Sequence, residues 1–197
     1  RLAEVFARDG RDLADILRGV WLGRSASELT EELISGYGEI WSAQLLAAHL
    51  VSMGEQAAWL DAREVLIVRP SDLGPRIDWD ESARRMNAWL AAHPVPLVVI
   101  TGFIASTPEG APTTLKRNGS DFSGSIFGAL MGAEEILIWT DVDGVLSADP
   151  RRVPEAVVLE AMSYDEACEL AYFGAKVLHP RTMEPAVSRD IPIRIKN

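Results

Sequence analysis

The chain has 197 residues, a length that suits one domain with a sizeable core. Hydrophobic residues make up 48% and charged residues 24%, which is the balance of a soluble globular protein, and no apolar run reaches the roughly 18 residues of a transmembrane helix. The net charge is -10 and the acidic residues are scattered, which argues against nucleic acid as a partner because phosphates attract basic surfaces. We therefore expect neither nucleic-acid nor membrane binding.

The only cysteine, Cys168, cannot form an internal disulfide, so we expect a reducing compartment, the cytoplasm. Its apolar helical surroundings predict a buried structural thiol rather than a nucleophile. The chain does not begin with methionine, and residues 193–197 read as a strand without a closing turn. We therefore expect a fragment of a longer polypeptide.

The first half of the chain reads as helices followed by short strands. Apolar positions recur at helical spacing, and Gly and Pro stand at the predicted ends. In chain order we predict a helix over residues 1–18, a helix over 25–33, a loop over 35–38, a helix over 39–53, strands over 57–60 and 65–68, and a helix over 79–92.

The second half contains two uninterrupted apolar runs, LVVIT and EILIWT. Continuous apolar strands are typically buried on both faces, as in parallel sheets. We also interpret the Trp and Met residues as core. In chain order we predict a strand over 97–101, a loop over 106–113, a helix over 121–131, a strand over 135–140, a helix over 164–175 and a strand over 191–195.

This alternation of strands and helices predicts an α/β fold, a three-layer α/β/α sandwich with a mostly parallel central sheet. Ligands of such sheets bind beyond the carboxyl ends of the strands. Three loops meet that condition: the loop after Thr101, the segment 117–121 and the loop after Thr140.

The segment 116–121 (KRNGSD) has the composition of an anion-binding loop. Gly119 and Ser120 at a helix start offer backbone N–H groups, and Arg117 offers a planar fork for a carboxylate. Asp121 could cap the helix or hold a lysine in place. An ordinary capped helix start with a solvated basic pair explains the same residues.

Four further polar residues admit two readings each. Thr140 and Asp141 end a strand, where a nucleotide or a plain polar turn would fit. Lys176 follows a helix end and could bind a phosphoryl group or favour the helix dipole. Glu39 opens the long helix and could complement its dipole or accept hydrogen bonds from an ammonium group. Neither a Walker loop nor a GxGxxG motif occurs in the chain, so the phosphate loops of the commoner kinases are missing.

Taken together, the motifs resemble the aspartokinases of the amino acid kinase family. The segments that carry the resemblance, in chain order, are GYGEIWSA (36–43), VVITGFIAS (98–106), TLKRNGSDFSG (114–124), IWTDVDGVLSADPR (138–151), MSYDEACELAYFGAKVLHPRT (162–182) and IPIRIKN (191–197). The resemblance implies that ATP phosphorylates L-aspartate to 4-phospho-L-aspartate with Mg²⁺, the first step toward lysine, threonine and methionine.

The resemblance also implies roles for individual residues. The substrate-binding residues it implies are Glu39, Arg117, Asn118, Gly119 and Ser120. The catalytic residues it implies are Asp121, which would organise the phosphate-binding lysines, and Lys176. The ATP-binding residues it implies are Thr140, Asp141, Leu146, Arg151, Lys176 and Val177. Leu146 stands where many members have a tyrosine. The resemblance implies no resident metal ligand and a homodimer.

Besides Leu146, two departures qualify the resemblance. Family members open with a lysine-glycine-glycine strand, which is missing here, so we expect residues 1–197 to be a catalytic domain truncated at its N-terminus. The paired regulatory ACT domains of the family are also absent. Asp143 stands where some monofunctional members have proline, and in this it is similar to the bifunctional aspartokinases. The 197-residue chain itself is expected to be weakly active or inactive. The alternatives are an inactive ligand-binding fragment, or a sibling kinase for glutamate, N-acetylglutamate or carbamate.

Overall fold

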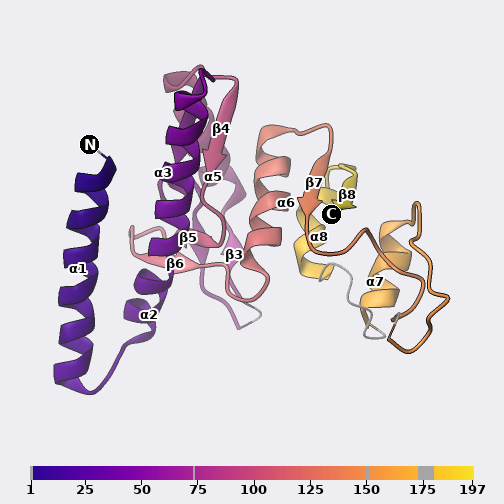
Figure 1. Ribbon diagram of the computed structural model, residues 1–197, viewed down its shortest axis with the longest axis horizontal. Coiled ribbons are helices and arrows are strands. Elements are labelled where there is room, and N and C mark those ends of the chain that lie inside the picture. The colour runs from indigo at the N-terminus through magenta and orange to yellow at the C-terminus, as the bar shows by residue number, and fades with distance from the viewer. Residues whose placement is uncertain (1, 73, 150, 173–179) are drawn as a thin grey trace. The chain divides into compact units, whose positions relative to one another are not determined.

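The computed structural model describes residues 2–72, 74–149, 151–172 and 180–197 (Figure 1). The chain divides into two compact units, Arg1–Lys116 and Arg117–Asn197. The expectation of one domain stays a prediction. Within the described ranges, none of the helices combines the length and apolar character that crossing a bilayer requires.

The first unit contains short strands flanked by longer helices. Its helices are α1 (Leu2–Gly23), α2 (Glu28–Ser35), α3 (Tyr37–Ser52), α4 (Ala62–Val65) and α5 (Trp79–Ala92). Its strands are β1 (Ala57–Leu60), β2 (Val68–Arg69), β3 (Arg76–Ile77), β4 (Leu97–Ile100), β5 (Ile104–Ser106) and β6 (Pro112–Thr114). Ser27 and Asp78 begin α2 and α5, because their side chains accept hydrogen bonds from the backbone N–H of Thr30 and Glu81.

Strands β1 and β4 run parallel, with Ala57 opposite Leu97 and Leu60 opposite Ile100. Helix α3 packs against both strands (Figure 1). The pairs β2–β3 and β5–β6 are antiparallel. The core of the unit is formed by large apolar side chains that are almost completely shielded from solvent: Leu60, Leu66, Ile67, Met86 and Ile104. The parallel pair and α3 together provide a rigid support for the residues that follow the strand ends.

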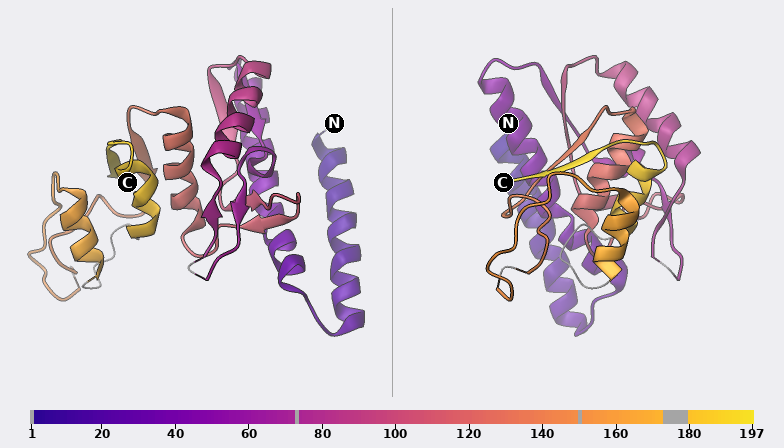
Figure 2. Two further views of the ribbon diagram at one scale, coloured as in Figure 1. Left: turned by 180° about the vertical axis from the view of Figure 1, so that it is seen from behind. Right: turned by 90° about the vertical axis from the view of Figure 1, so that its right-hand side faces the viewer.

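The second unit is built on one long helix. Its elements are α6 (Gly119–Met131), β7 (Ile136–Trp139), α7 (Tyr164–Tyr172), α8 (Pro180–Val187) and β8 (Ile193–Lys196). Strands β7 and β8 are parallel, and α6 packs against both α8 and β7 (Figure 2). The apolar core contains Phe122, Ile126, Ile136, Met183 and Ala186.

Most predicted elements are confirmed within a few residues, and the mixed α/β class with parallel strand pairs is confirmed. The predicted strand over 65–68 is wrong for its first half, because Asp61 caps a short helix, α4, and leaves only Val68 in a strand. The predicted loop over 35–38 shrinks to Gly36, which alone separates α2 from α3. The predicted loop over 106–113 is confirmed for residues 107–111, which form the tip of the β5–β6 hairpin, and is wrong for Ser106, Pro112 and Thr113, which lie in the strands.

Burial is where the sequence-based expectations fail most clearly. Strands β4 and β7 were expected to be buried on both faces, but each pairs with a single strand, and Leu97 and Leu137 remain about 40% exposed. The expectation that the Trp and Met residues are core is wrong for Trp21, Met53 and Trp139, which are about two-thirds exposed. Cys168 is only partly buried, because helix α7 turns Ala167 rather than its neighbour into the core.

At two glycines of α6, the addition of one methyl group is expected to change the free energy of unfolding in opposite directions. A Cβ on Gly128 would lie 2.7 Å from side-chain atoms of the buried Ile136, whereas a Cβ on Gly124 would meet nothing within 4 Å. Overpacking costs about 1–3 kcal/mol, while Gly→Ala in a helix contributes about 0.5–1 kcal/mol. We expect Gly128→Ala to lower the free energy of unfolding and Gly124→Ala to raise it. Urea unfolding should separate the two variants by about 1–3 kcal/mol, and equal stabilities would contradict the packing argument.

Candidate active site

Glu39 lies at the carboxyl ends of the parallel strands β1 and β4. It stands in the first turn of α3, and its Oε2 accepts a hydrogen bond of 3.2 Å from the backbone N–H of Gly102, two residues beyond β4. The buried Thr101 ties the two strand ends together: its N–H donates to the Leu60 carbonyl (3.1 Å), and its Oγ1 accepts from the N–H of Ala62 (2.8 Å). A half-buried carboxylate is thus held where ligands of parallel sheets bind.

The segment that enters α6 combines unusual backbone geometry with an uncapped helix start. Lys116 and Asn118 adopt left-handed backbone angles, with φ of 63° and 58°. Asn118 is the N-cap residue, but its side chain makes no capping hydrogen bond. The first N–H groups of the helix, at residues 119–121, therefore receive no capping hydrogen bond from the Asn118 side chain. Such groups, together with the helix dipole, favour an anion.

The predicted substrate-binding residues around this helix start differ in their exposure to solvent. Arg117, Asn118 and Ser120 are exposed, and Gly119 is buried. The hydroxyl of Ser123 donates to the Gly119 carbonyl at 2.9 Å, which ties the first turn to the helix. Arg117, whose guanidinium is a planar fork suited to a carboxylate, directly precedes the N-cap residue Asn118.

Asp121 is half-buried in the same first turn. Burial raises the pKa of its carboxyl above the ordinary value of 3.8. Partial burial thus disfavours the ionised form of this carboxyl group. A charged group in such a place is typical of functional sites.

The predicted nucleotide residues follow β7. Thr140 donates its backbone N–H to the Lys196 carbonyl (2.8 Å), and its hydroxyl donates to Asp141 Oδ1 (3.2 Å). Both residues are exposed. Leu146 forms an isolated antiparallel bridge with Val158, which closes the loop after β7 on itself.

Arg151 is engaged by its neighbour Asp149. Its Nε and Nη2 donate to the two carboxylate oxygens at 3.0 and 2.9 Å, and these bonds lower the pKa of Asp149 to about 2. Both side chains are exposed, so a nucleotide phosphate would compete with Asp149 for the guanidinium. Lys176 and Val177, also predicted as nucleotide-binding, lie outside the described residues.

The structure groups the predicted residues only in part. Glu39 belongs to the first unit, and the segment 117–121, Thr140, Asp141, Leu146 and Arg151 belong to the second. Thr140 and Asp141 are hydrogen-bonded to each other, and residues 117–121 form one continuous turn. Among residues 2–72, 74–149, 151–172 and 180–197, no group of three or more His, Cys, Asp or Glu side chains gathers around a possible metal position.

Sequence reasoning missed two features. A cavity of about 530 Å³ in the second unit is lined by Gly144, Tyr164 and Met183 among others, and the predicted nucleotide residues that the structure describes (Thr140, Asp141, Leu146 and Arg151) do not line it. The second feature is an ion-pair cluster in which Lys116 contacts Glu28 and Glu32. The four-residue spacing of these glutamates on a predicted helix was the available signal, since it places both on one face.

Comparisons with known proteins were made on both sequence and structure. The model of the amino acid kinase family matches residues 7–197. Among curated proteins, the chain is 49% identical over 192 residues to bifunctional aspartokinase/homoserine dehydrogenase 2, chloroplastic, of Arabidopsis thaliana, covering 96% of this chain and 21% of that protein. It is 43% identical over 163 residues to bifunctional aspartokinase/homoserine dehydrogenase 2 of Escherichia coli, covering 83% of this chain and 20% of that protein.

Among solved structures, E. coli aspartokinase III in complex with aspartate and ADP superimposes with a TM-score of 0.89 at 32% identity. The match covers 98% of this chain and 43% of that chain. It confirms the predicted fold. The chain spans about a fifth of the length of the curated relatives described above.

Proposed function

Because this chain belongs to the amino acid kinase family, we propose that it supplies aspartate- and ATP-binding residues to an enzyme that phosphorylates the side-chain carboxylate of L-aspartate. The product is 4-phospho-L-aspartate, and the step begins the biosynthesis of lysine, threonine and methionine. The observation that carries the proposal is the uncapped start of α6 directly after Arg117, a site that suits the α-carboxylate of an amino acid. The three similar proteins described above are named as aspartokinases, which supports the same substrate.

On this proposal each substrate group has a partner of opposite character. Arg117 binds the α-carboxylate, helped by Asn118 and the backbone N–H groups of Gly119 and Ser120. The Glu39 carboxylate, held by Gly102, accepts from the α-ammonium group. The side-chain carboxylate of the substrate is thereby left free to react.

The reaction itself needs no general base. An oxygen of the substrate side-chain carboxylate, already ionised at neutral pH, attacks the γ-phosphorus of ATP. The bond from the γ-phosphorus to the β–γ bridging oxygen breaks, and ADP leaves with that electron pair. Catalysis then depends on positioning and on neutralising charge. Asp121 would position the cationic side chain that binds the ATP phosphates. We propose that this side chain is Lys176.

ATP would be held by Thr140, Asp141, Leu146, Arg151, Lys176 and Val177. Mg²⁺, when bound with ATP, neutralises phosphate charge. Mg²⁺ usually keeps several waters and is bound through substrate phosphates and one or two carboxylates, so it would enter with the nucleotide.

We further propose that the enzyme is a cytoplasmic homodimer and that it binds neither nucleic acid nor membranes. The two bifunctional relatives share close to half of their matched residues with this chain, which favours a fused homoserine dehydrogenase in the parent protein.

The test is a phosphoryl-transfer assay on the full-length protein and on the 197-residue chain. ATP, Mg²⁺ and aspartate should yield an acyl phosphate that hydroxylamine traps as a hydroxamate. Glutamate, N-acetylglutamate and carbamate should give less than about a hundredth of the aspartate rate, since a site built for one substrate's polar groups rejects analogues strongly. A rate with any of these three substrates that exceeds the rate with aspartate would overturn the assignment to aspartate.

A further inference from the structure

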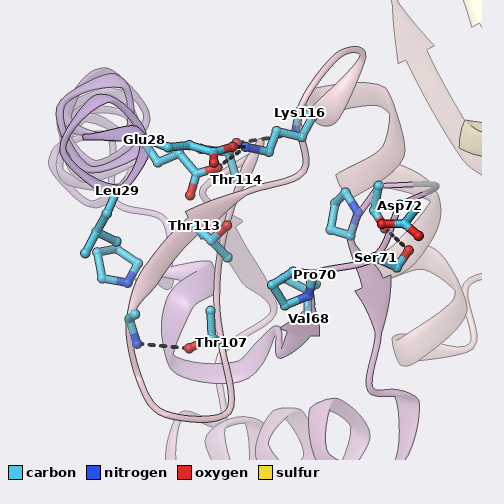
Figure 3. A pocket seen from close by; sticks show the side chains of 15 residues that line it. Glu28, Leu29, Val68, Pro70, Ser71, Asp72, Thr107, Thr113, Thr114 and Lys116 are labelled. Atoms are coloured by element: carbon cyan, nitrogen blue, oxygen red, sulfur yellow. Dashed lines mark hydrogen bonds and ion pairs between the residues drawn. The ribbon is translucent and has the colours of Figure 1, made fainter. Parts of the chain in front are cut away.

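Lys116 is held by two carboxylates at the point where the first unit ends. Its Nζ donates to Glu28 Oε1 at 2.6 Å and also to Glu32 Oε1 (Figure 3). The two glutamates are one turn apart on α2, so both face the same side of the helix. They line, with Lys116, a cavity of about 520 Å³ between α2, β2 and the β5–β6 hairpin.

We term the contact of Lys116 with Glu28 and Glu32 the Lys116 clamp. The backbone beside the Lys116 clamp is also held by hydrogen bonds. Leu115 is buried and donates its N–H to the Phe103 carbonyl at 2.7 Å. The backbone N–H of Lys116 donates to Thr114 Oγ1 at 3.4 Å. The φ angle of Lys116 is 63°, a left-handed conformation that is costly for a residue with a Cβ. A strained conformation persists only where surrounding contacts enforce it, and the two glutamates provide such contacts.

The clamp is more than a solvated ion pair. Exposed pairs contribute little, and Glu28, with 78% of its side chain exposed, fits that description. Glu32 is different, because only 12% of its side chain is exposed. The hydrogen bonds with Glu28 and Glu32 raise the pKa of Lys116, so the lysine stays charged throughout the physiological range.

We propose that Lys116 is a positioning residue for the substrate: the clamp fixes the point and direction from which Arg117 leaves the hairpin. This inference rests on the proposed function, in which Arg117 binds the α-carboxylate of aspartate. Lys116 does not touch the substrate. Its effect passes through the backbone of its neighbour, and misplacing a binding group by about 1 Å can cost up to about 100-fold in rate.

The test uses three variants of the full-length protein. Lys116→Met removes the charge and keeps the apolar stem, Glu32→Gln weakens the clamp from the other side, and Lys116→Arg restores a cation. We expect the first two to raise the KM for aspartate about 5- to 20-fold, with the KM for ATP and kcat changed less than about 2-fold. Lys116→Arg should return the KM for aspartate to within about 3-fold of the wild-type value.

The matched control is Arg84→Met, which removes another exposed cation of the first unit from its ion pair with Glu81. It should leave both KM values unchanged. If Lys116→Met lowers the melting temperature but moves neither KM, the lysine is merely structural and the inference is wrong. If the wild-type protein does not phosphorylate aspartate at all, the proposed function itself fails, and that outcome is visible before any variant is compared.

Discussion

Replacing Arg117 by lysine should lower kcat/KM for aspartate by about 30- to 150-fold and leave the KM for ATP within about 2-fold. A guanidinium binds a carboxylate through two parallel hydrogen bonds, whereas an ammonium is a point charge on a flexible stem. Losing that geometry removes about 2–3 kcal/mol of binding energy. Arg117 is exposed at an uncapped helix start, so the substitution should not disturb the fold. Steady-state kinetics with each substrate varied in turn measures the effect.

A substrate analogue sharpens this prediction. β-Alanine keeps the ammonium and the reacting carboxylate of aspartate but lacks the α-carboxylate. The wild-type protein should therefore discriminate against it strongly, and Arg117→Lys should discriminate far less. Arg189→Lys changes an exposed arginine in the turn after α8, and this matched control should behave as wild type. Undiminished discrimination in Arg117→Lys would show that another group binds the α-carboxylate.

Asp121→Asn should separate activity from stability. The substitution removes the charge that we propose organises the phosphate-binding lysine, so kcat should fall about 100- to 1000-fold. At the same time the melting temperature at pH 7 should rise by about 1–2 °C, because a partly buried carboxylate no longer has to stay ionised. Thermal unfolding beside the phosphoryl-transfer assay measures both effects.

The size of the stability gain from Asp121→Asn depends on pH. Burial raises the pKa of Asp121, so between the ordinary value of 3.8 and the raised folded value the folded state binds more protons than the unfolded state. Stability is therefore lost as the pH rises through this window, and the loss is complete above it. The advantage of Asp121→Asn should disappear below about pH 3.8, where the carboxyl is neutral in both states.

Asp165→Asn is the matched control for this pair of effects. Asp165 also stands in the first turn of a helix, α7, but it is exposed. Its removal should cost a little stability, since the helix dipole favours a negative charge there, and should leave kcat unchanged. A melting temperature for Asp121→Asn that falls at pH 7 would contradict the burial argument.

Local patterns in the sequence were enough to place most elements. The helix over 79–92 is observed with the predicted bounds, because its apolar spacing lies within the segment and its cap and following prolines lie within a few residues of its ends. The partial exposure of β4 and β7 was not predictable in this way. A strand's burial depends on how many strands pair with it and what covers its faces, and both are properties of distant segments.

The candidate site shows the same division. The segment 116–121 was identifiable from composition, and the structure adds its uncapped helix start and its two left-handed residues. The hydrogen bond from Gly102 to Glu39 joins residues 63 positions apart, and the contact of Lys116 with Glu28 joins residues 88 apart. No periodicity within one segment reports such contacts, so the sequence could name the side chains but not their partners.

Gly36 has a consequence for how the first unit transmits movement. It alone separates α2 from α3, its N–H donates to the Glu32 carbonyl, and its carbonyl accepts from the N–H of Ile40. A Cβ at this position would lie 3.0 Å from Ile104, so the junction has little room to flex. Glu28 and Glu32, which contact Lys116, lie on α2, and Glu39 lies on α3. Because one closely packed residue joins these two helices, a displacement of α2 should also displace Glu39.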